Sequence, residues 1–433
     1  MDKITIFWFR RDLRLKDNIA LYFALQSEYQ VLPIFIFDSE ILNELPRNEA
    51  RINFIFSQLQ KIKKTLHFQN SNLALFQGTP LEVFEKLVAR YKIQQVFCNE
   101  DYEPYAIARD RKIEGYLKDR YIGFKTYKDQ VIFEKDEVVK ADGNPYVVYT
   151  PFMKAWKEKF NIDKDCRNYC IQPHFQNLYR SAPDVNLTLE DLGFTKSQIQ
   201  IPEMDLSEEL IHNYERDRNY PSLDATSHLG PHLRFGTVSI RNIVTKASSQ
   251  GNEVFLNELI WREFFMQILW HFPETATEAF KKKYDRIEWR NNEIEFENWK
   301  VGKTGYPLVD AGMRQLNASG FMHNRVRMVV ASFLCKHLLI DWRWGEAYFA
   351  EKLLDYEMAS NVGNWQWAAG SGVDAAPYFR IFNPEAQMEK FDNNLQYIKK
   401  WVPEFGTEKY PPPMVNHKEA RERCLTAYKK ALS

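Results

Sequence analysis

The sequence predicts a fold in two parts, a doubly wound α/β domain with a parallel sheet followed by an all-α domain. Over about the first 134 residues, short apolar runs alternate with amphipathic helical segments. From about residue 207 onward, every strong periodic signal is helical. Long amphipathic helices are expected at 253–270 and 323–339, and a helix at 309–319 is expected to stop at Gly320. Between them, prolines interrupt the pattern at positions 145, 151, 173, 183 and 202. We therefore expect an α/β domain at 1–134, an inter-domain connection at 135–206 and a helical domain at 207–433.

Each element of the N-terminal part has a local signal. The compact apolar run at 4–9 is typical of a strand buried on both faces. Further strands are expected at 31–37, 73–76 and 95–98, with strand material between 123 and 133. Helices are expected at 18–27, 51–66, 80–91 and 104–117. This alternation predicts parallel strands with helices on both faces of the sheet.

The turn after the first strand lacks a phosphate-binding glycine motif. It is Arg10-Arg11-Asp12-Leu13-Arg14, and the sequence contains no G-x-G-x-x-G. A standard dinucleotide site is therefore not supported. The sheet domain is expected to serve as a scaffold or to hold some other chromophore.

Composition and cysteine spacing exclude several classes of site. Lysine plus arginine (58) equals aspartate plus glutamate (58), so any nucleic-acid surface must be a local basic patch. The five cysteines are scattered, and no second close pair joins Cys166 and Cys170, so no metal site is expected. There is no signal-peptide pattern and no apolar run of about 18 residues, which favours a cytoplasmic protein away from membranes.

The helical part contains residue groups that are ambiguous one at a time. Glu258, Trp261 and Arg262 share a helical face, as a surface ion pair beside a core tryptophan also would. Asn324 and Met328 are i, i+4 neighbours on a basic helix. The stretch 355–370 surrounds two tryptophans with small residues and suits either a planar heterocycle or tight packing. The turn at 226–230 suits either a phosphate or a helix cap.

Taken together, these groups have a recognisable order. The strings are Trp8-Phe9-Arg10-Arg11-Asp12-Leu13-Arg14, Gly305-Tyr306-Pro307, Asp310-Ala311-Gly312-Met313-Arg314 and Asp374-Ala375-Ala376-Pro377-Tyr378-Phe379-Arg380-Ile381-Phe382-Asn383-Pro384. The sequence closely resembles the photolyase/cryptochrome family from end to end, and within it the class I cyclobutane dimer photolyases. The resemblance implies light-driven repair of cyclobutane pyrimidine dimers in DNA by electron transfer from reduced FAD to a flipped-out dimer.

The resemblance also implies where FAD binds. In the family the helical domain holds this cofactor, which is reduced in the active form. Asn361 matches the residue beside flavin N5, and Gly230 stands where some relatives have serine. The positions that match FAD contacts are Tyr214, Thr226, Ser227, His228, Leu229, Gly230, Arg262, Arg327, Asp355, Tyr356, Glu357 and Asn361.

Further roles follow from the same resemblance. The positions that match the catalytic lesion pocket are Glu258, Trp261, Asn324, Met328 and Trp367. Arg218, Arg325 and Gln387 match DNA-strand contacts. Trp365, Trp342 and Trp289 match an electron-transfer chain that runs from the flavin to the surface. The implied partner is damaged DNA, and the protein is expected to be a monomer.

Three alternatives stay open at this stage. Lyases of (6-4) photoproducts carry histidines in the stretch that is Asn324 to Met328 here. Cryptochrome blue-light receptors tend to have aspartate or cysteine at the position of Asn361 and often a long C-terminal extension, whereas this chain stops soon after a helix at 417–432. A general flavin electron-transfer protein has no specific feature in its favour.

An antenna chromophore in the N-terminal domain is a further expectation from the family. Where some folate-binding relatives have an asparagine–glutamate pair, this chain aligns Tyr105-Ala106. The identity of the antenna, and whether there is one, are therefore left open.

Overall fold

The computed structural model describes residues 2–180 and 187–433, so Pro183 of the expected connection lies outside the described residues. The chain forms two compact units. One comprises 1–134, 160–204 and 229–249, and the other comprises 135–159, 205–228 and 250–433. Parts of the stretch expected to be a connection thus belong to each unit. Residues 229–249 belong to the unit with the sheet, although they lie within the range expected for the helical domain.

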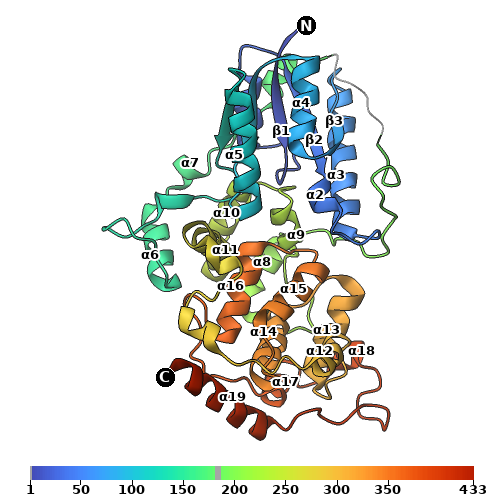
Figure 1. Cartoon of the computed structure of the whole chain (residues 1–433), viewed down its shortest axis with the longest axis vertical. Coiled ribbons are helices and arrows are strands. Elements are labelled where there is room, and N and C mark those ends of the chain that lie inside the picture. Colours follow the sequence, from blue (N-terminus) through green and yellow to red (C-terminus); the bar gives the residue numbers. More distant parts are fainter. Residues whose placement is uncertain (1, 181–186) are drawn as a thin grey trace. The chain divides into compact units, whose positions relative to one another are not determined.

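The first unit is built around one parallel sheet (Figure 1). Its strands are β1 (Lys3–Phe9), β2 (Val31–Asp38), β3 (Ala74–Gly78), β4 (Lys92–Asn99) and β5 (Gly123–Tyr127). The spatial order is β3-β2-β1-β4-β5, with every neighbouring pair parallel. Because β1 has β2 on one side and β4 on the other, the order reverses beside β1. The doubly wound α/β fold predicted from sequence is confirmed.

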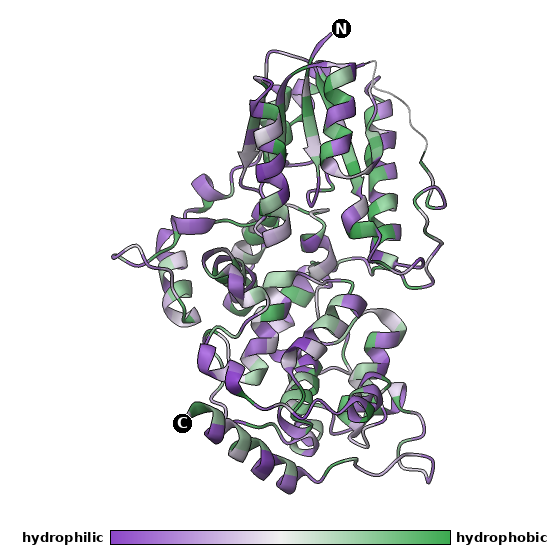
Figure 2. Ribbon diagram, in the orientation of Figure 1, coloured by the Kyte–Doolittle hydropathy of each residue, from purple (hydrophilic) through white to green (hydrophobic). Residues whose placement is uncertain are grey.

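Helices cover both faces of this sheet. On one face, β1 residues such as Phe7 pack with α1 (Ile19–Leu25) and α3 (Ala50–His67). On the other face, β1 residues such as Trp8 pack with α4 (Pro80–Arg90) and α5 (Pro104–Lys118). Figure 2 shows hydrophobic residues along β1 and β2 and both classes of residue on the surrounding helices. The run at 4–9 lacks alternation because both of its faces are buried.

Shorter elements complete the first unit. After β2, α2 (Ser39–Leu42) begins at once, with the Asp38 side chain as its N-cap. The remaining helical elements of this unit are α7 (Ile162–Asp165), a 3₁₀ turn at Gln172–Asn177, α9 (Leu229–Arg234) and α10 (Ile240–Ser249).

Apart from an isolated bridge between Val139 and Pro145, the regular elements among the described residues of the second unit are helical. Its α-helices are α6 (Tyr149–Lys159), α8 (Glu208–Asp217), α11 (Glu253–His271), α12 (Glu293–Lys300), α13 (Pro307–Ser319), α14 (Asn324–Ser332), α15 (Trp342–Lys352), α16 (Met358–Ala369), α17 (Pro384–Phe391), α18 (Gln396–Trp401) and α19 (His417–Leu432). The unit also has 3₁₀ turns at Lys135–Glu137, before α6, and at Pro273–Ala276 and Lys282–Arg286, between α11 and α12. The main core of the unit is formed chiefly by α13, α14, α15 and α16.

Two helix boundaries test the sequence prediction. The helix expected to stop at Gly320 does so, since Gly320 adopts the left-handed conformation at φ +67°. The helix expected at 323–339 is interrupted, because α14 gives way to a π-helical turn at Phe333–His337. Among the described residues, no helix is both long and apolar enough to cross a membrane. The same residues contain no group of three or more His, Cys, Asp or Glu side chains placed to hold a metal ion.

Candidate functional site

The exposed edge of α11 carries the first group of predicted site residues. Asn252 caps the helix by accepting from the Phe255 amide, which fixes the start of the helix. Trp261 lies on the partly exposed face, and its ring stacks with that of Phe265 at 5.6 Å. Tyr149 of α6 also stacks nearly parallel to Trp261, with ring centroids 3.5 Å apart and planes 8° apart. Two aromatic neighbours therefore fix the orientation of the Trp261 indole.

Tyr149 is a site neighbour that the sequence prediction missed. Its hydroxyl donates to the Asn257 carbonyl at 2.8 Å, so the ring is anchored to α11 by a hydrogen bond as well as by stacking. Burial, and then the nearby Glu258, raise the pKa of Tyr149, so the hydroxyl keeps its proton. No local signal pointed to this contact, because Tyr149 and Trp261 are more than 100 positions apart in the sequence.

Glu258 pairs with Arg218 in this structure. Arg218 follows the last turn of α8, and its Nη1 donates to Glu258 Oε1. The guanidinium also lies over the Tyr214 ring, 5.3 Å from its centroid. A predicted catalytic residue, a DNA contact and a cofactor contact therefore meet at one point. Burial, and then Glu258, raise the pKa of Tyr214 to about 12.

The first turn of α14 brings a second set of predicted residues together. Arg325 donates to the Asn219 side chain at 2.6 Å, just beyond Arg218. It also lies 4.4 Å from the centroid of the Phe391 ring on α17. Gln387 is one helical turn before Phe391, so it shares that side of α17. Asn324 is exposed and Met328 is half-buried, which leaves both able to contact a ligand.

Two ion pairs join the long helices to the segment before α16. Arg327 of α14 donates to Asp355 Oδ2 at 2.9 Å, and Arg262 of α11 donates to Glu357 Oε1 at 2.9 Å. The second oxygen of Asp355, Oδ1, is buried without a hydrogen-bond partner in the described part of the chain. A buried orphan acceptor is costly, so Oδ1 is suited to an N–H or O–H donor from a ligand.

Asn361 is held on one side by α15. Its side-chain Nδ2 donates to the carboxyl oxygen of Glu346 at 2.9 Å and to the Glu346 carbonyl at 3.1 Å. Burial raises the pKa of Glu346. Because the NH₂ group is engaged, the Asn361 carbonyl oxygen is the end of the amide directed away from Glu346, and it is suited to accept from an N–H donor.

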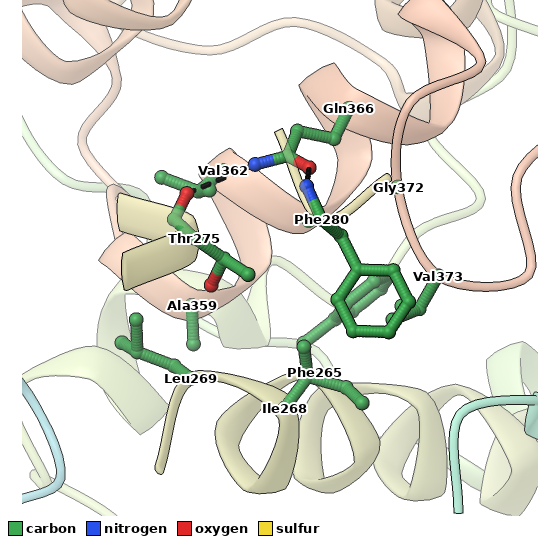
Figure 3. A pocket seen from close by; sticks show the side chains of 11 residues that line it. Phe265, Ile268, Leu269, Thr275, Phe280, Ala359, Val362, Gln366, Gly372 and Val373 are labelled. Carbon is green, nitrogen blue, oxygen red and sulfur yellow. Dashed lines mark hydrogen bonds between the residues drawn. The ribbon is translucent and has the colours of Figure 1, made fainter. Parts of the chain in front are cut away.

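Close backbone approach positions α16 against α11. Figure 3 shows the junction, a small space of about 10 Å³ bounded by Phe265, Ile268 and Leu269 of α11 and by Ala359 and Val362 of α16. A Cβ at Gly363 would lie only 2.2 Å from the Phe265 ring. Gln366 accepts from the Phe280 amide and donates to the Thr275 and Glu278 carbonyls, which ties the 275–280 loop to α16. The junction is therefore packed structure.

The three tryptophans of the expected electron-transfer chain all pack in or against one core. Trp365 and Trp342 are buried, and Trp289 is partly exposed. Trp365 lies against the backbone of Gly345, where a Cβ would be 2.1 Å from the indole. The Trp365 ring also contacts Trp299 at 6.2 Å, a tryptophan that the sequence prediction did not single out. Exposure is therefore greater at Trp289 than at Trp342 and Trp365, and the role of the three in electron transfer stays a prediction.

The turn predicted to bind phosphate spans the boundary between the two units. Thr226, Ser227 and His228 belong to the helical unit, whereas Leu229 and Gly230 belong to the unit with the sheet. His228 has φ +50°, and its Nε2 is 2.8 Å from Asp224. Its Nδ1 is buried without a hydrogen-bond partner among the described residues. The Nδ1 atom of His228 is therefore suited to a hydrogen bond with a ligand.

The first unit has its own cavity, of about 180 Å³, at the carboxyl ends of β1 and β2. Trp8 forms part of the wall, with the guanidinium groups of Arg10 and Arg109 about 5 Å from its ring centroid. Tyr105 donates to Asp38 at the rim, and Ala106 follows it in the wall. The carboxyl edge of a doubly wound sheet, near the reversal of strand order, is a usual place for ligands.

Two family models match the chain. The model described as DNA photolyase matches residues 5–171, and the model described as the FAD binding domain of DNA photolyase matches residues 255–408. A deoxyribodipyrimidine photo-lyase of Synechococcus is 36% identical, over 98% of this chain and 96% of the relative. That of Escherichia coli is 35% identical, over 98% of both chains.

The chain belongs to the DNA photolyase family.

Solved structures of photolyases have the same fold over nearly the whole chain. A bacterial class III photolyase from Agrobacterium tumefaciens superposes with a TM-score of 0.85 and 33% identity, covering 100% of this chain and 98% of that one. An archaeal photolyase from Sulfolobus tokodaii with two FAD molecules gives 0.83 and 36%, covering 98% and 99%. A Synechocystis cryptochrome gives 0.84 and 25%, covering 98% and 99%. The fold is thus shared by repair enzymes and a cryptochrome.

The helical unit of this photolyase family member fits FAD by its chemistry. The Asp355 and His228 side chains each keep a buried polar atom without a hydrogen-bond partner in the described part of the chain, and Asn361 keeps an acceptor for an N–H donor. Arg262 and Arg327 supply positive charge beside the same segment. Flavin and phosphate groups need donors and acceptors of these kinds.

Proposed function

We propose that this chain is a light-driven DNA repair enzyme, a deoxyribodipyrimidine photolyase, that splits cyclobutane pyrimidine dimers by electron transfer from reduced FAD to a flipped-out dimer. The observation that carries the proposal is the similarity to curated deoxyribodipyrimidine photo-lyases, at 33–36% identity over nearly the full chain. The lesion-pocket residues of the family are present and lie on α11, α14 and α16 of one compact unit.

The pocket residues have separate tasks. Trp261 and Trp367 provide flat apolar walls for a dinucleotide that has left the base stack, and Met328 provides a polarisable contact. Glu258 and Asn324 provide hydrogen-bonding groups for the carbonyl and N–H edges of the pyrimidines. Arg218 pairs with Glu258 in this structure. When a lesion binds, the Glu258 side chain therefore has to contact both Arg218 and the lesion. The contact with Arg218 therefore holds the Glu258 side chain in place before DNA arrives.

Cofactor residues orient the flavin and set its electrostatic surroundings. FAD, when bound and reduced, supplies the electron that opens the dimer under light. Asn361 presents its carbonyl oxygen to an N–H donor because Glu346 takes the NH₂ group. Arg327 and Asp355 form one charged pair and Arg262 and Glu357 another, so the site contains fixed dipoles that need little reorganisation. Tyr214, Tyr356 and the 226–230 turn complete the proposed set.

DNA binding is proposed for Arg218, Arg325 and Gln387. Arg218 and Arg325 are half-buried, so their positions are fixed by protein contacts before DNA binds. Contacts to phosphates are independent of sequence, which suits an enzyme that must find a lesion anywhere in a genome. We propose that the protein acts as a monomer in the cytoplasm.

A second chromophore is proposed for the cavity at the carboxyl ends of β1 and β2. The cavity of about 180 Å³ and its wall of Trp8, Arg10 and Arg109 suit a flat conjugated ligand. The Sulfolobus tokodaii photolyase structure contains two FAD molecules, one implicated as a light-harvesting cofactor. The absorption spectrum of the purified protein would identify the second chromophore of this chain.

A cryptochrome-type receptor is the second candidate, favoured by the structural likeness to the Synechocystis cryptochrome. A (6-4) photoproduct lyase is less compatible, because Asn324 and Met328 replace the histidines of those enzymes. The assay below separates the proposed function from both alternatives, since only a cyclobutane dimer photolyase splits thymine dimers under light.

The deciding experiment uses the FAD-loaded protein after reduction with dithionite. We expect it to split thymine dimers in an oligonucleotide under near-UV or blue light and not in the dark. Glu258→Ala should lower the repair yield per absorbed photon and keep the flavin content. Glu253→Ala, on the first turn of the same helix, is the matched control. Equal repair in darkness, or none with the reduced protein under light, excludes the proposal.

A further inference from the structure

His323 lies between the start of α14, which carries two of the proposed lesion contacts, and the end of α8. It precedes α14 as the N-cap residue, and its Nδ1 accepts from the Arg325 amide at 3.1 Å. Its carbonyl accepts from the amides of Val326 and Arg327 at 2.9 and 3.0 Å. His323 therefore satisfies three amide groups of the first turn, the turn that begins with Asn324.

The opposite edge of the ring faces the end of α8. Because Nδ1 accepts a hydrogen bond, the proton of the neutral ring is on Nε2. Nε2 is buried and has no hydrogen-bond partner among the described residues. The residue as a whole is only 3% exposed. The backbone of Arg218 lies close enough to favour a proton on this ring. His323 is thus directed from α14 toward the residue that pairs with Glu258.

Positive charge surrounds this imidazole. Arg325 and Arg327 lie on α14 itself, and Arg218 lies at the end of α8. Each arginine is directed to another partner: Glu258 for Arg218, Asn219 for Arg325 and Asp355 for Arg327. Burial, followed by Arg327 and Arg325, lowers the pKa of His323 to about 4. The ring is therefore neutral at physiological pH, as an N-cap acceptor has to be.

We propose that His323 is a positioning residue for lesion recognition, which as a neutral cap holds the first turn of α14 against the end of α8. It fixes the positions of Asn324 and Arg325 relative to the Arg218–Glu258 pair. The polar side chains of the pocket are therefore held in a single arrangement. The inference deepens the proposed function, because it rests on Asn324 and Glu258 being lesion contacts.

Two variants separate the cap from the ring. His323→Ala removes the acceptor, and His323→Asn keeps a good N-cap without the imidazole. We expect His323→Ala to weaken binding of a dimer-containing oligonucleotide about fivefold to tenfold, the size of a lost helix cap. Binding of undamaged DNA and the FAD content should not change, and His323→Asn should restore most of the loss. Equal discrimination by His323→Ala and the unaltered protein overturns the proposal, as does a failure of His323→Asn to restore binding when FAD is retained.

A measurement on the unaltered protein covers the case in which both variants fail to fold. The ratio of affinities for damaged and undamaged DNA is followed as the pH falls from 7 to 4, with FAD absorbance recorded in parallel. We expect the ratio to be constant above about pH 5 and to fall as His323 takes up a proton near its pKa of about 4. A constant ratio to pH 4 overturns the positioning role. Absence of any preference for dimers at pH 7 would instead mean that the proposed function is wrong.

Discussion

At the scale of single residues, the candidate site depends on neighbours that come from distant parts of the sequence. Trp261 is the clearest case, since its indole stacks with Phe265 of its own helix and with Tyr149 of α6. The spacing on α11 predicted the face on which Trp261 lies. It could not predict Tyr149, because a stacking partner is chosen by the tertiary fold.

Tyr149 should matter for lesion binding through this stack. Replacing Tyr149 with alanine removes a parallel aromatic contact worth about 0.5–1.5 kcal/mol, so the affinity for dimer-containing DNA should fall roughly twofold to tenfold. Tyr149→Phe keeps the stack and loses only the hydrogen bond to Asn257, so it should be milder. Binding titrations with damaged and undamaged oligonucleotides measure both effects. An alanine variant as tight as the unaltered protein would remove Tyr149 from the pocket.

Trp365 should be needed for photoreduction of the flavin and should not be needed for the repair reaction. Trp365→Phe is expected to slow light-driven reduction of oxidised flavin at least tenfold, since an electron hop through an indole is lost. Protein already reduced with dithionite should repair dimers at an unchanged rate. Flavin absorbance under illumination measures the first rate and an oligonucleotide assay the second, with Trp270→Phe on α11 as the control. Photoreduction at the normal rate would place the electron path elsewhere.

At the scale of elements, the site is set by how closely helices approach. Gly363 brings α16 against Phe265, and Gly345 makes room for Trp365. The π-helical turn after α14 places the buried Lys336 so that it donates to the carbonyls of Ala369, at the end of α16, and Tyr378. Burial lowers the pKa of Lys336 to about 8. Apolar periodicity predicted a continuous helix here. Periodicity carries no information about which carbonyls the Lys336 side chain will bind, so it could not predict the π-helical turn.

Gly363→Ala tests the approach of α16 to α11. The new Cβ would be 2.2 Å from the Phe265 ring, so the helices must separate or the ring must turn. Overpacking of this kind typically costs about 1–3 kcal/mol, and FAD retention should fall with it. Gly115→Ala on α5 meets no atom within 4 Å and should be neutral or slightly stabilising. Urea unfolding and flavin content measure both variants, and equal stability of the two would contradict the packing account.

At the scale of the whole molecule, charge is balanced overall and uneven locally. The chain has 58 basic and 58 acidic side chains, so long-range attraction to DNA is weak and the local arginines have to provide it. Arg218 and Arg325 lie at adjoining ends of α8 and α14, within one compact unit. Binding to undamaged DNA is therefore expected to be modest and dependent on few phosphate contacts.

Salt dependence tests that expectation. The logarithm of the association constant for an undamaged duplex should fall linearly with the logarithm of salt concentration. Arg325→Gln should make the slope shallower by about 1, the effect of one lost phosphate contact. Arg120→Gln, an exposed arginine of the sheet unit, should leave the slope unchanged. Equal slopes for Arg325→Gln and the unaltered protein would remove Arg325 from the DNA contacts.

The sequence by itself determined the alternation of strands and helices, the predominantly helical second part and the choice of candidate site residues. These follow from apolar periodicity, from glycine stops such as Gly320 and from strings of residues that match a family. They are local properties, or properties of short stretches, and can be read without a fold.

Only the tertiary structure decided which side chains meet. The Tyr149–Trp261 stack, the Arg218–Glu258 pair, the hold of Glu346 on Asn361 and the place of His323 all join residues that a linear pattern does not connect. The same holds for the assignment of 229–249 to the unit with the sheet. The physical reason is that stacking, ion pairing and burial depend on distance in space, which the packing of whole helices sets.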